Sequence, residues 1–189
     1  MNLSLTDQPA LILVDIQKGF DDIAYWGGGR NNPDAEQNAA RLLAHWRKNK
    51  LPLFHIQHCS SDPESRLAEG QEGNDIKDEV SPTAEETVIK KNVNSSFIGT
   101  DLQERLDQQG IKKLVIVGLT TDQCVSTTTR MAGNFGYETY IVNDATATFD
   151  KVLHGKTYPA QLLHETALAS IHLEFAEVVD TQDIVAALS

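Results

Sequence analysis

Three side chains that could cooperate in nucleophilic catalysis each follow an apolar stretch of this sequence. Asp15 lies in LVDIQKGF, Lys91 in VIKKNVNSSF and Cys124 in VGLTTDQCVSTTTR. A thiol can attack a carbonyl carbon, a carboxylate can take up and return protons, and an ammonium can stabilise the anions that form. Together these residue types indicate acyl chemistry that needs no histidine as its base.

Cys124 stands close to the point where an apolar run ends and a helix is expected to begin. In a first helical turn, unpaired backbone N–H groups and the positive end of the helix dipole stabilise a thiolate or an oxyanion. Each of the three residues also has a simpler interpretation. Cys124 would be a small buried filler, Lys91 a solvated charge, and Asp15 a loop cap, a metal ligand or a phosphate acceptor.

Catalysis by these residues requires a framework that brings three distant stretches together. Six apolar runs rich in β-branched residues are expected to form strands: ALILVDI (10–16), LPLFHIQH (51–58), TVIK (87–90), KLVIVGL (113–119), ETYIVND (138–144) and FAEVVD (175–180). Segments with helical spacing lie between most of them: 33–50, 100–110 with Thr100 as its N-cap, 159–172 and 181–188.

Strands that are apolar on both faces and alternate with amphipathic helices predict an α/β fold, with a parallel sheet covered on both sides. Ligands of such sheets bind outside the carboxyl ends of the strands, which is where the three candidate residues fall. Two irregular segments, 25–30 and 59–86, are expected to be loops near the mouth of the site. The longer one is expected to act as a lid.

The composition favours a single domain (1–189) that works away from nucleic acids and membranes. The 189 residues carry 16 basic and 27 acidic side chains, and the resulting charge of -11 opposes binding to phosphate-rich partners. No segment approaches the roughly 20 apolar residues of a membrane span. Two cysteines without a secretory leader predict free thiols and a cytoplasmic protein.

The sequence resembles the isochorismatase-like cysteine hydrolases, a family that includes nicotinamidases and N-carbamoylsarcosine amidases. The similar pieces are ALILVDIQKGF, VIKKNVNSSFIGTDL and VIVGLTTDQCVSTTTRMAGNFGYETYIVNDATATF, which occur in the family's order and at its spacing. The resemblance implies a three-layer Rossmann-like fold with a six-stranded parallel sheet in the order 3-2-1-4-5-6.

The same resemblance implies a catalytic triad of Asp15, Lys91 and Cys124. Lys91 matches the family lysine better than Lys90 because it lies four residues before Ser95. A triad with a cysteine implies hydrolysis of a C–N bond, of amide or carbamoyl type, in a small molecule. The reaction would pass through a thioester and use no cofactor.

The resemblance also implies a cis peptide bond between Leu119 and Thr120. This bond would aim the backbone N–H groups of Thr120 and Cys124 at one point and so form an oxyanion hole. Two other functions stay open: hydrolysis of a vinyl ether, as in the name-giving isochorismatases, and a non-catalytic binding or partner module. Because members of the family are usually homo-oligomers, a homo-oligomer is expected.

A possible metal site and the pocket walls complete the list of candidates. His55, His58 and Cys59 offer metal-binding atoms, but the Asp-x-His arrangement of nicotinamidases is absent, so no bound metal is expected. Packing and loop hydrogen bonds are the expected roles of these residues. Three aromatic residues in nearby loops are candidate pocket walls, with ordinary packing as the alternative: Phe20, Trp26 and Phe97.

Overall fold

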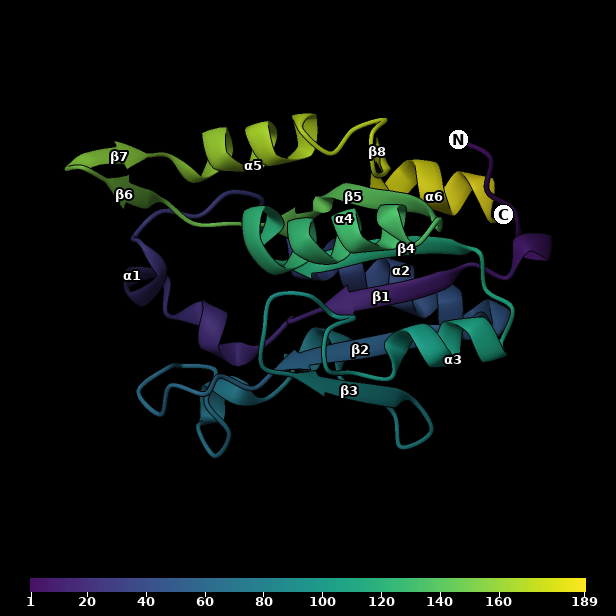
Figure 1. Ribbon diagram of the computed structural model, residues 1–189, viewed down its shortest axis with the longest axis horizontal. Coiled ribbons are helices and arrows are strands. Elements are labelled where there is room, and N and C mark those ends of the chain that lie inside the picture. The colour runs from purple at the N-terminus through teal and green to yellow at the C-terminus, as the bar shows by residue number, and fades with distance from the viewer.

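The six expected strands form one parallel sheet in the computed structural model, which describes residues 1–189 (Figure 1). They are β1 (Ala10–Val14), β2 (Leu53–His58), β3 (Thr87–Lys91), β4 (Lys113–Leu119), β5 (Glu138–Ala147) and β8 (Glu177–Val179). The order β3-β2-β1-β4-β5-β8 confirms the prediction, because β8 is the sixth strand of this sheet. Both chain termini lie near the amino ends of the strands.

Helices cover both faces of the sheet. One face carries α2 (Ala35–Asn49) and α6 (Thr181–Ala187), and the other carries α3 (Leu102–Gln108), α4 (Ser126–Asn134) and α5 (Ala160–Ala169). Every residue of β1 and β4 is buried, as expected for strands covered on both sides. No helix combines the length and the apolar character that crossing a membrane requires.

The central strands β1 and β4 approach each other closely at their carboxyl ends. Gly118 has a φ of +121°, and a Cβ atom added there would lie 1.9 Å from the carbonyl oxygen of Val14. Only glycine fits such a position. The register pairs Val14 with Gly118, so Asp15 and Thr120 follow strands whose carboxyl ends lie side by side.

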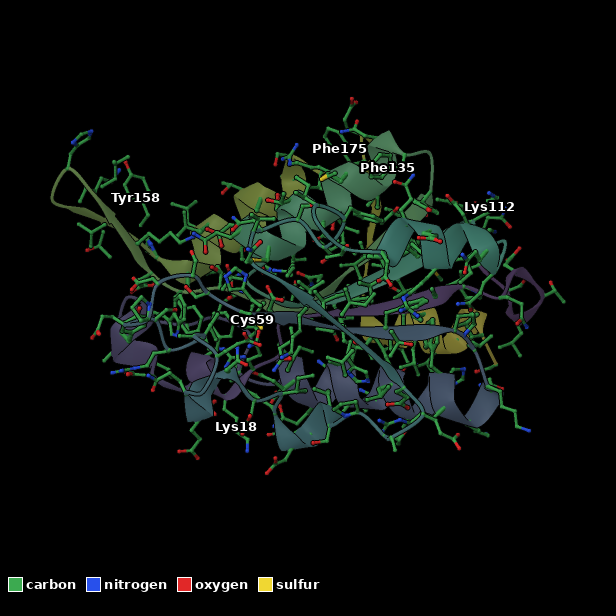
Figure 2. The ribbon with its side chains drawn as sticks, turned by 60° about the horizontal axis from the view of Figure 1, so that its bottom comes forward. Lys18, Cys59, Lys112, Phe135, Tyr158 and Phe175 are labelled. Atoms are coloured by element: carbon green, nitrogen blue, oxygen red, sulfur yellow. The ribbon has the colours of Figure 1, made fainter.

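A short antiparallel hairpin is the main element that the sequence patterns did not predict. β6 (Lys151–Leu153) and β7 (Lys156–Tyr158) are joined by His154 and Gly155, which both have positive φ. Two-residue turns of this kind favour Asn-Gly or Asp-Gly, so a His-Gly pair is a weak signal. The hairpin projects from the body of the molecule at the carboxyl end of the sheet (Figure 1), and Tyr158 lies on it (Figure 2).

Two helix starts also differ from the prediction. Asp101, not Thr100, is the N-cap of α3, and the Thr100 hydroxyl instead donates to the Ser96 carbonyl at 2.6 Å. Between β4 and α4, the segment Thr121–Val125 forms one π-helical turn, so the α-helix itself begins at Ser126. Single π-helical turns occur frequently at functional sites.

The two irregular segments are held against α2 by a buried ion cluster. Lys77 of the longer segment donates to Glu36 Oε1 at 2.7 Å and to Asp21 Oδ1 at 2.5 Å. Arg30 of the shorter segment donates to Glu36 Oε2 at 2.5 Å. The side chains of Lys77 and Glu36 are only 6% and 5% exposed. Lys77 thus attaches the segment 59–86 to α2, and the lid motion of this segment stays a prediction.

Candidate active site

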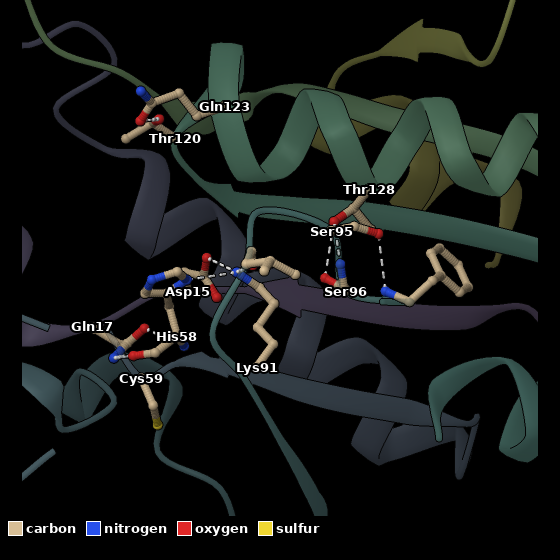
Figure 3. Close-up of polar contacts among 12 residues, drawn as sticks. Asp15, Gln17, His58, Cys59, Lys91, Ser95, Ser96, Thr120, Gln123 and Thr128 are labelled. Atoms are coloured by element: carbon tan, nitrogen blue, oxygen red, sulfur yellow. Dashed lines mark hydrogen bonds and ion pairs between the residues drawn. The ribbon is translucent and has the colours of Figure 1, made fainter. Parts of the chain in front are cut away.

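Asp15 is fully buried at the point where the chain turns away from β1. Its φ of +50° is uncommon for a residue other than glycine, and its N–H donates to the Ile56 carbonyl at 3.0 Å. The ammonium of Lys91, the last residue of β3, donates to Asp15 Oδ2 at 2.6 Å, and neither side chain is exposed (Figure 3). The fold thus joins two of the three candidate residues in a buried ion pair.

All three N–H groups of the Lys91 ammonium have acceptors. Besides Asp15, they are the Val93 carbonyl at 3.1 Å and Nδ1 of His58 at 3.2 Å. His58 and Lys91 are paired residues of the neighbouring strands β2 and β3. Because β2 separates β3 from β1, the long lysine side chain has to pass the end of β2 to reach Asp15.

Cys124 lies in the π-helical turn and completes the cluster. Its sulfur, a carboxylate oxygen of Asp15 and a ring nitrogen of His58 all lie within 4.8 Å of one another. The Leu119–Thr120 peptide bond is cis, as the resemblance implied. No backbone carbonyl accepts a hydrogen bond from the Thr120 N–H. The oxyanion hole at Thr120 and Cys124 stays a prediction that this geometry permits.

The loop after β3 is attached to the helix that follows Cys124. The Ser96 N–H donates to Thr128 Oγ1 at 3.1 Å, and the two hydroxyls lie 2.9 Å apart (Figure 3). Ser95 Oγ donates to the sulfur of Met131 at 2.7 Å. Threonines are poor helix formers, but here Thr128 fixes the segment of Lys91 relative to the segment of Cys124.

Burial decides the protonation states in this cluster. Burial raises the pKa of the Asp15 carboxyl above its ordinary value, and the charge and hydrogen bond of Lys91 offset part of that rise. Burial, followed by the Asp15 carboxylate, also raises the pKa of the Cys124 thiol. These shifts oppose the thiolate expected at a helix start and favour a protonated Cys124 thiol, with the Asp15 carboxylate near enough to accept its proton.

We expect iodoacetamide to modify Cys124 slowly at neutral pH and to modify it faster in the Asp15→Asn variant. The substitution removes the carboxylate that raises the thiol pKa and leaves the Lys91 ammonium, which lowers it. The measurement is the modification rate of the Cys124 peptide against pH, with the Cys59 peptide as internal reference. An Asp15→Asn protein that reacts more slowly than the parent would contradict these protonation states.

The three aromatic candidates lie in two different places. Phe20 is buried, with its ring centroid 4.6 Å from that of Trp26 and 5.9 Å from that of Phe149. Phe97 belongs to the core on the opposite face of the sheet and packs against Phe135 at 5.3 Å. All three therefore have packing partners, and their contact with a substrate stays a prediction.

The three residues considered for a metal site do not come together. His55 is buried and its Nε2 lies 3.1 Å from the carboxylate of Glu86. Cys59 lines a polar cavity of about 370 Å³ at the ends of β2 and β3, together with Lys90. Only His58 reaches the candidate active site. Packing and hydrogen bonds, the expected roles, describe His55, whereas the His58 ring also hydrogen-bonds to Lys91 in the candidate active site.

A different donor set, made of Asp15, His58 and Cys124, is close enough to surround an ion. However, the Lys91 ammonium hydrogen-bonds to both Asp15 and His58. A fixed positive charge in this position repels a metal cation, and displacing it would remove a buried ion pair. The residues present therefore do not fit a metal centre.

Three residues that support the site were not identified as such from the sequence. Besides His58, they are Gln17, which binds the backbone of His58, and His164. His164 is buried, with Nδ1 bonded to the Thr121 hydroxyl at 2.9 Å and Nε2 to Asn143 Oδ1 at 2.8 Å. Burial lowers its pKa and keeps the ring neutral. The only sequence signal for Gln17 is its place two residues after Asp15.

Comparison with known proteins agrees with this geometry. The isochorismatase domain profile matches residues 9–183. The isochorismatase family protein YrdC of Bacillus subtilis is 46% identical over 182 residues, covering 96% of each chain. A crystal structure from Chromobacterium violaceum, assigned to a hydrolase of the isochorismatase family, superposes with a TM-score of 0.92 at 44% identity and covers 96% of this chain and 93% of its own.

More distant relatives carry the names of C–N hydrolases. Nicotinamidase 3 of Arabidopsis thaliana is 27% identical over 184 residues, which cover 90% of this chain and 84% of that protein. Ureidoacrylate amidohydrolase RutB of Acinetobacter baylyi is 27% identical over 212 residues, which cover 95% and 83%. The domain match over residues 9–183 and the similarity to the two family members of 46% and 44% identity show that the chain belongs to the isochorismatase family of hydrolases.

Proposed function

We propose that this hydrolase cleaves a C–N bond of amide or carbamoyl type in a small molecule, with Asp15, Lys91 and Cys124 as its catalytic triad. The observation that carries the proposal is the buried Lys91–Asp15 ion pair with the Cys124 thiol within 4.8 Å of the carboxylate. The amidohydrolase names of two relatives support the same class of bond.

The first half of the reaction forms a thioester. Asp15 removes the proton from Cys124 as the sulfur adds to the carbonyl carbon, and the Thr120 and Cys124 N–H groups bind the resulting oxyanion. Oδ1 of Asp15 is buried without a hydrogen-bonding nitrogen or oxygen partner, so a lone pair is available for this proton. When the C–N bond breaks, Asp15 returns the proton to the leaving nitrogen.

The second half of the reaction releases the acid. Asp15 takes a proton from water, the water oxygen adds to the thioester carbonyl, and the C–S bond breaks. The proton then returns to the sulfur and restores the neutral thiol. Lys91 keeps its charge in every step and stabilises the carboxylate whenever Asp15 is ionised. No step uses a cofactor or a metal ion.

Two alternatives stay distinguishable from this proposal. Vinyl-ether hydrolysis would use Asp15 as an acid and form no bond to sulfur. A non-catalytic module would bind its ligand without turnover. The close approach of the thiol to a proton acceptor favours C–N cleavage, because neither alternative has a use for it.

The test is a panel of small primary amides, cyclic amides and carbamoyl compounds, followed by release of ammonia or amine. Reactions are quenched in acid early in turnover, and the mass of the Cys124 peptide is measured. We expect an acyl adduct on Cys124 that disappears as substrate is consumed. Turnover of a vinyl ether with no adduct, or ligand binding with no turnover of any compound, would replace the proposal by the corresponding alternative.

We also propose that the chain forms a homo-oligomer through the β6–β7 hairpin. Val152 and Leu153 are 68% and 56% exposed there, and an isolated two-stranded hairpin is marginally stable in water. The exposed Lys156 of the hairpin adds a positive charge that complements a chain of charge -11. Light scattering should give a mass that is a multiple of 20.8 kDa. In the Val152→Asp, Leu153→Asp double variant, this mass should fall towards that of the monomer. A parent protein that is already monomeric rules this out.

A further inference from the structure

The His58 side chain occupies a half-buried position between solvent and the buried ion pair. It lies at the carboxyl end of β2, and a ring nitrogen lies within 4.8 Å of both the Asp15 carboxylate and the Cys124 sulfur. Its Nδ1 is 3.2 Å from Nζ of Lys91 (Figure 3). His58 therefore lies close to every member of the proposed triad and hydrogen-bonds to Lys91, although no step of the mechanism above uses it.

The contact with Lys91 fixes the state of the ring. A lysine ammonium has only donors, so Nδ1 of His58 has to be the acceptor and carries no proton. The ring is then neutral, with its hydrogen on Nε2. Burial, followed by the Lys91 charge, lowers the pKa of His58, whereas the Asp15 carboxylate raises it, so the neutral ring agrees with its surroundings.

The side-chain amide of Gln17 binds the backbone of His58 in the way that the backbone of a neighbouring strand would. β1 stops pairing with β2 after the bond from Asp15 N–H to Ile56, because Asp15 turns the backbone away. The Gln17 amide supplies the next pair of hydrogen bonds: Oε1 accepts from the His58 N–H at 2.8 Å, and Nε2 donates to its carbonyl at 3.0 Å.

Asn74 reinforces this clamp from the irregular segment. Its Nδ2 donates to the same His58 carbonyl at 2.9 Å, and its own carbonyl accepts from Gln17 Nε2 at 2.8 Å. Gln17 is fully buried and Asn74 is 7% exposed. Two buried side-chain amides thus hold the backbone of His58 and fix its position.

We propose that His58 is a positioning residue whose Nδ1 lone pair holds one N–H of Lys91 and so directs the ammonium onto Asp15. Without this acceptor, the ammonium is held only by the Val93 carbonyl and the carboxylate, and it can rotate away from Oδ2 of Asp15. The base would then be displaced relative to the thiol. The effect on catalysis rests on the proposed function, whereas the hydrogen bond itself does not.

The first experiment measures the hydrogen bond without a substrate. Two-bond ¹H–¹⁵N correlation spectra of the histidine rings report which nitrogen carries the proton. For His58 we expect a neutral ring with the hydrogen on Nε2 at neutral pH. A proton on Nδ1, or a charged ring, would overturn the proposal even if every amide in the panel were a substrate.

The second experiment uses three replacements of His58 that differ in where they place an acceptor. Oδ1 of asparagine lies at the same number of bonds from Cβ as Nδ1, whereas Oε1 of glutamine lies one bond further. We expect His58→Asn to keep kcat close to the parent value, and His58→Gln and His58→Ala to lower it about 10- to 100-fold with little change in KM.

The outcomes separate positioning from direct proton transfer. Rescue by asparagine alone supports the proposal, because an amide cannot act as an acid or base in place of imidazole. Equal losses in folded His58→Asn and His58→Ala proteins overturn it and assign the imidazole itself to the chemistry. If no compound is turned over by the parent enzyme, the proposed function fails while the ring spectra still decide the His58 contact.

Discussion

Replacing Cys124 with alanine is expected to lower kcat/KM for C–N hydrolysis by at least about 10⁴-fold, because the reaction then has no nucleophile. The half-buried sulfur packs beside the apolar core under α4, so its loss should cost stability only about 1 kcal/mol. The measurement is steady-state amine release with the best compound of the panel, together with thermal unfolding of both proteins.

Cys59→Ala is the matched control for this variant. Cys59 is the only other cysteine and directly follows β2. It lines a cavity that Lys91 also lines but that contains neither Asp15 nor Cys124. Its replacement should leave kcat/KM close to the parent value. If Cys124→Ala retained a tenth of the parent activity, the thioester route would be wrong and Asp15-based acid catalysis would take its place.

Replacing Lys91 with methionine is expected to destabilise the protein by about 3–5 kcal/mol at about pH 8, because it leaves the buried Asp15 carboxylate without its ion pair. The Asp15→Asn, Lys91→Met double variant should recover much of this loss, since it buries no charge. Urea unfolding of the two single variants, the double variant and the parent gives the coupling energy directly.

The pH dependence of this loss has a defined sign. Without Lys91, burial alone acts on Asp15 and its folded-state pKa rises further above the unfolded value. A carboxyl group whose pKa is higher in the folded than in the unfolded protein costs no stability below its unfolded-state pKa. As the pH rises further, the carboxyl ionises more readily in the unfolded protein, and stability is lost until the pH passes the folded-state pKa. Lys91→Met should therefore be closer to the parent at about pH 5 than at about pH 8. A deficit that does not change with pH would show that the lost interaction is not the ion pair.

The framework of the site could be predicted from the sequence because it depends on patterns of many residues. Continuous apolar runs separated by amphipathic helices specify a covered parallel sheet, and the sheet order places β1 beside β4. The patterns place Asp15 and Cys124 at the same edge of the sheet, and the strand order implied by the family resemblance makes their strands neighbours. To predict the contact between Lys91 and Asp15, one further assumption was enough, namely that the long lysine side chain extends past β2.

The parts that were not predicted depend on single conformations and on contacts between distant residues. The role of Gln17 follows from the left-handed backbone of Asp15, which no residue pattern announces. The role of His58 depends on its register with Lys91, and an alternating strand pattern does not distinguish it from a surface histidine. The raised pKa of Cys124 follows from burial and from the Asp15 carboxylate, and both depend on contacts with residues that are distant in the sequence.

The position of the chain termini has a consequence for handling the enzyme. Both ends lie near the amino ends of the strands, and the α-amino group of Met1 is 3.1 Å from Glu177 at the start of β8. The candidate active site lies at the other end of the sheet. An affinity tag, a fluorescent fusion partner or a surface tether on either terminus thus points away from the entrance to the site. Immobilised enzyme attached in this way should present its catalytic face to the solution.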